Sequence, residues 1–195
     1  MRIETEELII RNFELKDEND LCEYMLQRVS AEFEAYPDFT ALKAKETIEF
    51  RVHNDEFYAI ELKEEHKVIG NIYLGNRNFN TRELGYVLNE NYHQRGYGSA
   101  ASKAVIDYFF SQGVHRIYAE CAPQNTSSWK LMEKIGMRRE AYFRKNVSFR
   151  QDEKGNPIYW DTFVYAILNP MDENEKGSLL NRPHKLDQNP SRHKV

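Results

Sequence analysis

A glycine-containing turn between an extended run and a helix constrains this chain more than any other segment. Its residues are Arg95, Gly96, Tyr97, Gly98, Ser99 and Ala100. The extended run before it covers residues 83–88, and the helix after it is predicted to reach about Phe110. The first N–H groups of a helix have no intrahelical partner and carry partial positive charge. Residues without Cβ also let the backbone approach a ligand closely. The turn therefore predicts an anion site that suits a diphosphate.

Two familiar phosphate-binding motifs do not account for this turn. The chain contains no Gly-x-x-x-x-Gly-Lys-Ser/Thr segment. A dinucleotide fingerprint requires a third glycine where this chain has Ala101, and it requires the first strand of a βαβ unit. Glu120 stands at a suitable distance for a ribose contact, but the strand before the turn is not the first of the domain. A tight strand-to-helix turn without a ligand remains the alternative.

Several short segments around the turn occur in an order that resembles one protein family. Residues 95–100 match the pattern Arg/Gln-x-x-Gly-x-Gly/Ala. The other matching segments are 5–11, 68–72, 83–88, Asn125-x-x-Ser128, 135–137, 140–141 and 160–165. Together they resemble the GNAT superfamily of acyl-CoA-dependent N-acetyltransferases. The last two segments are similar to the closing hairpin of its RimJ/RimL-like subgroup, the ribosomal-protein N-acetyltransferases. The resemblance covers roughly residues 1 to 169.

The order of elements predicts a mixed α/β (α+β) fold. We expect a sheet of about seven strands with helices on both faces. The resemblance implies a GNAT-like sheet whose strands are mostly antiparallel. A long closing strand pair is predicted around 138–149 and 158–168, joined by a charged loop. Residues 1–169 are expected to form the N-acetyltransferase domain. Residues 170–195 are expected to be a flexible polar tail, because they hold too few aliphatic side chains to offset their ordering entropy.

Composition excludes several classes of protein. The chain has 195 residues, of which 41% are hydrophobic and 30% charged, with a net charge of −4. This charge argues against a nucleic-acid binder that relies on bulk positive charge. No apolar run approaches the ~20 residues needed to span a bilayer, and the acidic N-terminus does not suit a signal peptide. Cys22 and Cys121 have no metal-ligand spacing, so we expect no metal, reduced thiols and a cytoplasmic location.

The resemblance implies which residues bind acetyl-CoA, the expected cosubstrate. Residues 95–100 would hold the diphosphate. The pantetheine arm would pair like an extra strand with the backbone of Val87, Leu88 and Asn89, where a bulge opens the strand. Asn125 would hydrogen-bond the same arm. An alternative for Asn125 is to cap the following helix.

The resemblance also implies two catalytic residues. Glu83 matches the position of the presumed general base, and its alternative is a solvated strand residue beside Arg82. Ser128 matches a serine that protonates the leaving thiolate, and its alternative is a polar residue near a helix start. Tyr142 is a reserve candidate for this acid. Cys121 is the candidate for an acyl carrier, with simple packing as its alternative.

The expected function is acetyl transfer to a primary amine in a direct ternary complex. The acceptor is either a protein N-terminus or a small amine such as a polyamine, amino acid or antibiotic. The resemblance implies that the first two helices and the late hairpin build the acceptor region, where they supply Glu32, Glu34, Tyr36, Arg150, Asp152, Glu153 and Lys154. The acidic groups among these suit a cationic amine, with solvated surface as the alternative. The competing function is a non-catalytic acyl-CoA-binding regulatory protein. We expect a monomer or homodimer.

Overall fold

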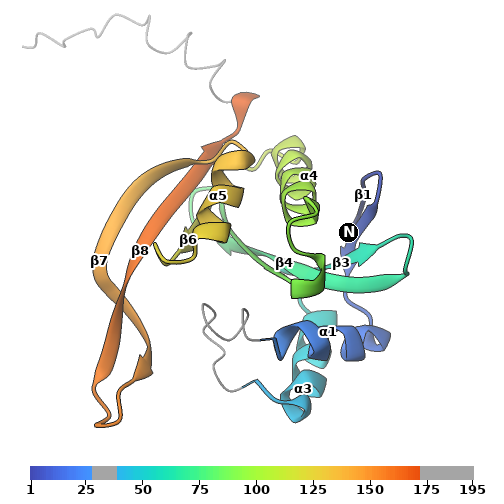
Figure 1. The fold of residues 1–195 in the computed structure, drawn as a ribbon. Coiled ribbons are helices and arrows are strands. Elements are labelled where there is room, and N and C mark those ends of the chain that lie inside the picture. Colours follow the sequence, from blue (N-terminus) through green and yellow to red (C-terminus); the bar gives the residue numbers. More distant parts are fainter. Residues whose placement is uncertain (28–38, 172–195) are drawn as a thin grey trace, which may run out of the picture.

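The computed structural model describes residues 1–27 and 39–171, which form one mixed sheet with helices on both faces (Figure 1). The strands are β1 Arg2–Glu4, β2 Leu8–Asn12, β3 Phe57–Leu62, β4 Lys67–Arg77, β5 Thr81–Leu88, β6 Arg116–Cys121, β7 Arg138–Gln151 and β8 Pro157–Leu168. The helices are α1 Glu18–Met25, α3 Ala41–Val52, α4 Tyr97–Ser111 and α5 Thr126–Lys134. Two short 3-10 helices are η1 Leu15–Asp17 and η2 Glu90–Tyr92.

The sheet has eight strands in the order β1-β2-β3-β4-β5-β6-β8-β7. Every neighbouring pair is antiparallel except β5 with β6. The predicted mixed, mostly antiparallel fold is therefore confirmed. The strand beyond the predicted number is β1, whose three residues pair with β2 at the sheet edge. Three residues are too few to show a period-two pattern, so the sequence carries little sign of this strand.

Each face of the sheet buries its own hydrophobic cluster. Helices α4 and α5 cover one face, and α1 and α3 cover the other (Figure 1). Fully buried members of the first cluster include Ile60, Ile72, Val105 and Ile117. Fully buried members of the second include Leu21, Tyr24, Ile48 and Ala59. Helices therefore cover the middle strands on both faces. A ligand can reach these strands only where two neighbouring strands separate.

The sheet opens between β5 and β6. These strands pair only at Thr81–Glu83 with residues 116–118. Beyond that point β5 stays paired with β4 as far as Leu88, and β6 stays paired with β8 as far as Cys121. Each strand follows its longer antiparallel partner, and the sheet twist drives the two halves apart once the short parallel contact ends.

The predicted bulge in the strand at 83–88 is wrong. The pairing of β4 with β5 runs without a register shift from Gly70 opposite Leu88 to Arg77 opposite Thr81. The opening therefore comes from divergence of two strands and not from an extra residue in one of them.

Strands β7 and β8 form a long curved arm that extends away from the helices (Figure 1). The predicted closing strand pair is confirmed, with its turn at residues 152–156. At this turn the Asp152 carboxylate accepts the backbone N–H groups of Lys154 and Asn156, both at 2.9 Å. Gly155 supplies the left-handed residue that the turn requires, with φ of 81°.

Within residues 1–27 and 39–171, none of the helices combines the length and apolar character needed to cross a bilayer. The predicted tail lies almost wholly outside the described residues, so its character stays a prediction.

Candidate active site

A cavity of about 990 Å³ lies where β5 and β6 part. Its walls come from α3, the middle strands, the β5–α4 connection, α5 and the inner side of the β7–β8 arm. The predicted site residues that line it are Glu83, Val87, Leu88, Gly96, Tyr97, Gly98, Ser99, Asn125 and Ser128. The predicted residues outside its lining are Asn89, Arg95 and Ala100. The structure therefore gathers most of the predicted site, from three separate segments, around one opening.

The start of α4, where the sequence predicts an anion site, forms one end of this cavity. Gly96 precedes the helix with φ of 89°. The first N–H group that is bonded inside the helix is that of Ala100, which donates to the Gly96 carbonyl at 3.0 Å. The N–H groups of residues 96–99 thus have no intrahelical acceptor, and no side chain in the described part of the chain caps them. This arrangement suits a diphosphate.

The left-handed conformation at Gly96 leads to a prediction about stability. Gly96→Ala is expected to lower the free energy of unfolding by about 1–2 kcal/mol, because an L-residue is strained there. Gly98→Ala is the control, since its added Cβ meets only the flexible end of Leu131, at 2.9 Å. Urea denaturation measures both variants. Equal losses would contradict a backbone origin of the effect.

Asn89 has a different role from the one expected. Its side chain is fully buried, accepts the Gln27 amide at 2.9 Å and donates to Glu23 at 2.7 Å. Its backbone N–H donates to the Ile69 carbonyl at 2.8 Å, and its own carbonyl accepts the N–H of Tyr92 at 2.9 Å. These groups tie the end of β5 to α1 and η2, so none of them is open to a ligand.

Arg95 is exposed, with its guanidinium carbon 5.5 Å from the centre of the Tyr92 ring. It stands beside the helix start without lining the cavity. Its predicted contact with a diphosphate therefore stays a prediction, as does that of Ala100, whose N–H is already used within α4.

The open edge of β5 forms the middle of the cavity. Residues 84–88 pair with β4 on one side, and within the described residues no strand pairs with them on the other. Such an edge presents backbone N–H and C=O groups that an extended ligand can pair with as an added strand. This is the place where the sequence predicts the pantetheine arm.

Alternation along β5 divides the cavity into two sides. Successive strand residues point to opposite faces of a sheet. Tyr86 and Leu88 pack with the cluster under α4 and α5, whereas Val87 packs with the cluster under α1 and α3. By the same alternation Glu83 shares the face of Val87. We call these the α5 side and the α3 side.

Ser128 lies on the α5 side beside a tyrosine that sequence reasoning missed. The Tyr86 hydroxyl donates to the Ser128 carbonyl at 2.9 Å and lies 3.0 Å from Ser128 Oγ. The two residues are 42 positions apart in the chain. The alternation of side chains along the strand predicts that Tyr86 and Glu83 point to opposite faces of the sheet. The contact between Tyr86 and Ser128 could not be predicted, because it depends on where α5 packs.

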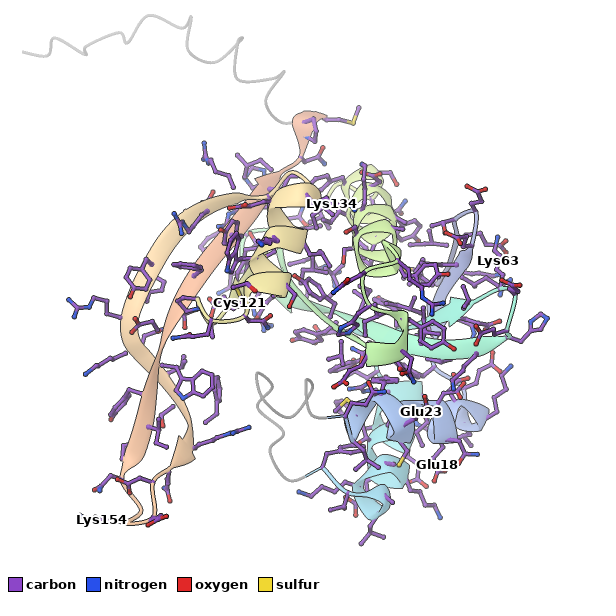
Figure 2. All side chains as sticks on the ribbon, in the orientation of Figure 1. Glu18, Glu23, Lys63, Cys121, Lys134 and Lys154 are labelled. Carbon is purple, nitrogen blue, oxygen red and sulfur yellow. The ribbon has the colours of Figure 1, made fainter. Side chains whose placement is uncertain are left out.

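Cys121 is also close to Ser128 on the α5 side. Burial raises the pKa of the Cys121 thiol to about 11, and its hydrogen bond with Ser128 offsets only part of this. A thiol with such a pKa is overwhelmingly protonated at pH 7, and the thiolate is the nucleophilic form. The acyl-carrier alternative is therefore chemically unfavourable. Figure 2 shows Cys121 at the end of β6, beside α5.

Asn125 caps α5, as its alternative interpretation predicted. Its side-chain oxygen accepts the backbone N–H of Ser128 at 3.2 Å. The amide nitrogen has no hydrogen-bond acceptor among the residues that the structure describes, and Asn125 borders the cavity. Capping and ligand binding use different atoms, so the two roles are compatible.

Glu83 lies on the α3 side and is neither solvated nor free. Its carboxylate pairs with Arg77 and accepts the Tyr118 hydroxyl at 3.2 Å. The side chain is 28% exposed. Its carboxylate carries negative charge on the α3 side of the cavity, where it can attract a cation.

Glu120 is the second carboxylate on the α3 side and was missed as a catalytic candidate. It follows Tyr118 by two residues on β6, so it shares the face of Glu83, and it lines the cavity. Partial desolvation raises the pKa of Glu120, the charge of Glu83 raises it further, and Arg77 lowers it. In the described part of the chain its carboxylate has no hydrogen-bond or ion-pair partner. A raised pKa and an unengaged carboxylate are what a general base requires.

The remaining predicted residues divide between the cavity and other places. Arg150 lines the cavity, whereas Lys154 lies at the distal tip of the arm (Figure 2). Tyr142 binds Asp161 on the arm, is 53% exposed and does not line the cavity, so the reserve acid is misplaced. The predicted acceptor residues at 32, 34 and 36 lie outside the described residues. Among the described residues, no group of three or more His, Cys, Asp or Glu side chains is placed to hold a metal ion.

Comparison with known proteins bears directly on this geometry. The family model described as acetyltransferase (GNAT) domain matches residues 7–138. The chain is 38% identical over 174 residues to the uncharacterized N-acetyltransferase YnaD of Bacillus subtilis (strain 168), covering 86% of this chain and 97% of that protein. It is 35% identical to a crystal structure of a GNAT-family acetyltransferase from Bacillus anthracis, with a TM-score of 0.79, over 87% of this chain and 99% of that one.

A more distant structure has the same fold. It is RimL, a ribosomal L7/L12 alpha-N-protein acetyltransferase in complex with coenzyme A, with a TM-score of 0.73 and 15% identity. The alignment covers 86% of this chain and 98% of that one. At this identity the likeness concerns the fold alone. The family model, the close relatives and a sheet that opens beside a partner-free helix start agree, and the chain therefore belongs to the GNAT family of acetyl-CoA-dependent N-acetyltransferases, of the RimJ/RimL type.

Proposed function

We propose that this protein transfers the acetyl group of acetyl-CoA directly to a primary amine, on a protein N-terminus or a small molecule, in a ternary complex. The observation that carries the proposal is the two-sided cavity. It joins the open edge of β5 and the helix start on the α5 side to the carboxylates of Glu83 and Glu120 on the α3 side. One side suits the thioester donor, and the other suits an ammonium.

The residues present fit acetyl-CoA. The N–H groups of residues 96–99 would bind the diphosphate, and the edge at 84–88 would pair with the pantetheine arm. The amide nitrogen of Asn125 would donate to the same arm, and a backbone N–H on that edge would donate to the acetyl oxygen. When bound, acetyl-CoA supplies an activated acetyl thioester.

Glu83 and Glu120 have different roles toward the amine. An amine arrives mostly as an ammonium and must lose a proton before it can attack. Glu83, paired with Arg77, holds the cation in place. Glu120 accepts the proton, because its carboxylate has no partner among the described residues and because desolvation and the charge of Glu83 raise its pKa above the usual value. This assignment moves the general base from Glu83, the predicted residue, to its neighbour across the strand pair.

The proton for the leaving sulfur comes from the α5 side. Ser128 Oγ lies 3.0 Å from the Tyr86 hydroxyl, so the serine hydroxyl can give its proton to the thiolate while the tyrosine hydroxyl turns from the Ser128 carbonyl and passes its own proton to Oγ. Solvent water then reprotonates the tyrosine. Cys121 stays a neutral thiol and forms no acyl-enzyme.

The experiment that tests this function begins with calorimetric titration of acetyl-CoA. Wild-type protein is expected to bind saturably. Gly98→Trp is expected to lose detectable binding, because the indole fills the space between the helix start and Leu131. Asp107→Trp is the matched control, since that exposed position lies farther along the same helix.

Acceptor screening by release of free thiol follows, with peptides, amino acids and polyamines. Turnover with at least one primary amine is expected. Absence of acetyl-CoA binding in the wild type would contradict the proposal. Binding without thiol release for any acceptor would indicate the competing function, an acyl-CoA-binding regulatory protein.

A further inference from the structure

A buried arginine borders the α3 side of the cavity, and neither the coenzyme nor the proposed proton transfers make use of it. Arg51 of α3 is 3% exposed and lines the cavity. A buried guanidinium stays charged at every physiological pH, so its burial is costly unless partners surround it.

The partners that Arg51 has are uncharged. Its Nη1 donates to the Tyr24 hydroxyl and to Asn71 Oδ1, both at 3.0 Å. Its guanidinium carbon lies 4.8 Å from the centre of the Phe57 ring and 5.3 Å from that of Phe13. These contacts hold the guanidinium in one orientation without neutralising its charge.

The nearby carboxylates are committed elsewhere. Asp17 binds Arg11 through two hydrogen bonds, of 2.7 and 2.9 Å. Asp20 accepts the backbone N–H of Val68 at 2.8 Å. Among residues 1–27 and 39–171, no carboxylate lies within 4.0 Å of Arg51. The guanidinium is therefore a positive charge without an ion-pair partner in the described structure.

Donor groups remain on the same side chain. An arginine carries five N–H groups, and the two hydrogen bonds of Arg51 both start from Nη1. In the described residues, Nε and Nη2 have no acceptor, and neither is among the buried polar atoms that are sealed from solvent. Arg51 lines the cavity, and the guanidinium fork matches the geometry of a carboxylate, so these N–H groups are available to an anionic ligand there.

The strand register gives the approximate distance between Arg51 and the carboxylate of Glu83, which is expected to receive the amine. Its partner Asn71 pairs with Val87 on β5, whereas Glu83 pairs with Gly75, four residues farther along β4. Four strand residues span ~13 Å. The anion-binding and ammonium-binding groups thus lie on one face of the sheet, at opposite ends of the α3 side.

We propose that the acceptor carries a carboxylate roughly 10 Å from its reactive amine, and that Arg51 binds this carboxylate while Glu83 and Glu120 receive the amine. This inference rests on the proposed function and narrows its acceptor to a zwitterionic molecule such as an ω-amino acid or a short peptide. A polyamine is disfavoured, because it would place a second positive charge against an unpaired guanidinium.

A matched pair of probes tests this inference. The ω-amino acid 8-aminooctanoic acid and its amide, 8-aminooctanamide, carry the same primary amine and differ only in the carboxylate. Calorimetric titration of each into the complex with coenzyme A measures binding without turnover. The wild type is expected to bind the acid at least about tenfold more tightly than the amide, as charge-assisted hydrogen bonds to a carboxylate predict.

Variants on α3 assign the preference to one side chain. Arg51→Gln is expected to abolish the preference, and Arg51→Lys to keep part of it. Lys45→Gln removes the same charge from an exposed position on the same helix and is expected to leave the preference unchanged.

Three results would overturn the inference: equal or tighter binding of the amide by the wild type, binding of neither probe, or a preference that survives Arg51→Gln. The wild-type comparison decides the matter even if Arg51→Gln does not fold. Titration of acetyl-CoA into the same samples separates the two proposals, because intact coenzyme binding without the preference removes only this inference, whereas absent coenzyme binding removes the proposed function.

Discussion

Glu120→Gln is expected to lower kcat/KM about 100-fold or more while leaving acetyl-CoA affinity unchanged, because the ammonium loses the group that accepts its proton. Glu83→Gln is expected to have a smaller effect on kcat and a larger one on the KM of the amine, since Glu83 attracts the cation. Steady-state kinetics with one accepted amine measures both variants. Full turnover in Glu120→Gln would contradict the assignment of the base.

The pH dependence separates a base from a merely structural residue. A general base works only when unprotonated, so kcat/KM should fall as the pH drops through the pKa of Glu120. Desolvation and Glu83 raise this pKa, and Arg77 lowers it. Glu83→Gln removes a negative charge and should therefore move the acidic limb to lower pH. Arg77→Gln removes a positive charge and should move it to higher pH.

The same acceptor amine is used with every variant, so the ionisation of the amine contributes equally to all the pH profiles and does not affect the differences between them. Opposite movements of the limb in Glu83→Gln and Arg77→Gln support the coupling between the two carboxylates. A limb that stays in place in both variants would show that another group controls it.

Asp17→Ala is expected to lower the free energy of unfolding by about 3 kcal/mol, the lower end for a broken buried ion pair. Asp17 is 3% exposed and makes two hydrogen bonds to the guanidinium of Arg11, and it accepts the backbone N–H of Glu14 at 2.8 Å. Its loss leaves Arg11 with Glu61, which still binds Nε at 2.6 Å. That remaining partner is the reason for choosing the lower value.

Glu14→Ala is the matched control for this loss. Glu14 approaches the same arginine at 3.9 Å but is 52% exposed, so a change below about 1 kcal/mol is expected. Urea denaturation measures both variants. A similar loss in both would show that burial does not govern the effect. Asp17 also ends η1 where α1 begins, so the variant should loosen the helix that carries Tyr24.

Part of this structure could be predicted from interactions between residues that are close together in the sequence. Gly96 is the left-handed residue before α4, and the apolar spacing of that helix predicts its buried face, so the proposed anion site followed from residues close together in the chain. Asn125 showed the same kind of local signal as a helix cap. The resemblance added a sheet of mostly antiparallel strands, which the structure confirms.

Long-range packing decided what local patterns do not encode. The opening of the sheet depends on where the pairing of β5 with β6 stops, and α4 separates these strands in the chain. The predicted bulge was wrong for this reason. Long-range packing also brings Glu83 near Glu120, Tyr86 into hydrogen-bond contact with Ser128, and Arg51 into hydrogen-bond contact with Asn71.

There is a physical reason why some features could be predicted from the sequence and others could not. Helix starts, caps and turns are set by dihedral preferences and hydrogen bonds that act over a few residues, so the sequence by itself determined the turn before α4. Strand register and the direction of side chains across a twisted sheet depend on the burial of whole faces. Only the tertiary structure could therefore place two carboxylates and a buried arginine on one side of the cavity, and it is these residues that define the expected acceptor.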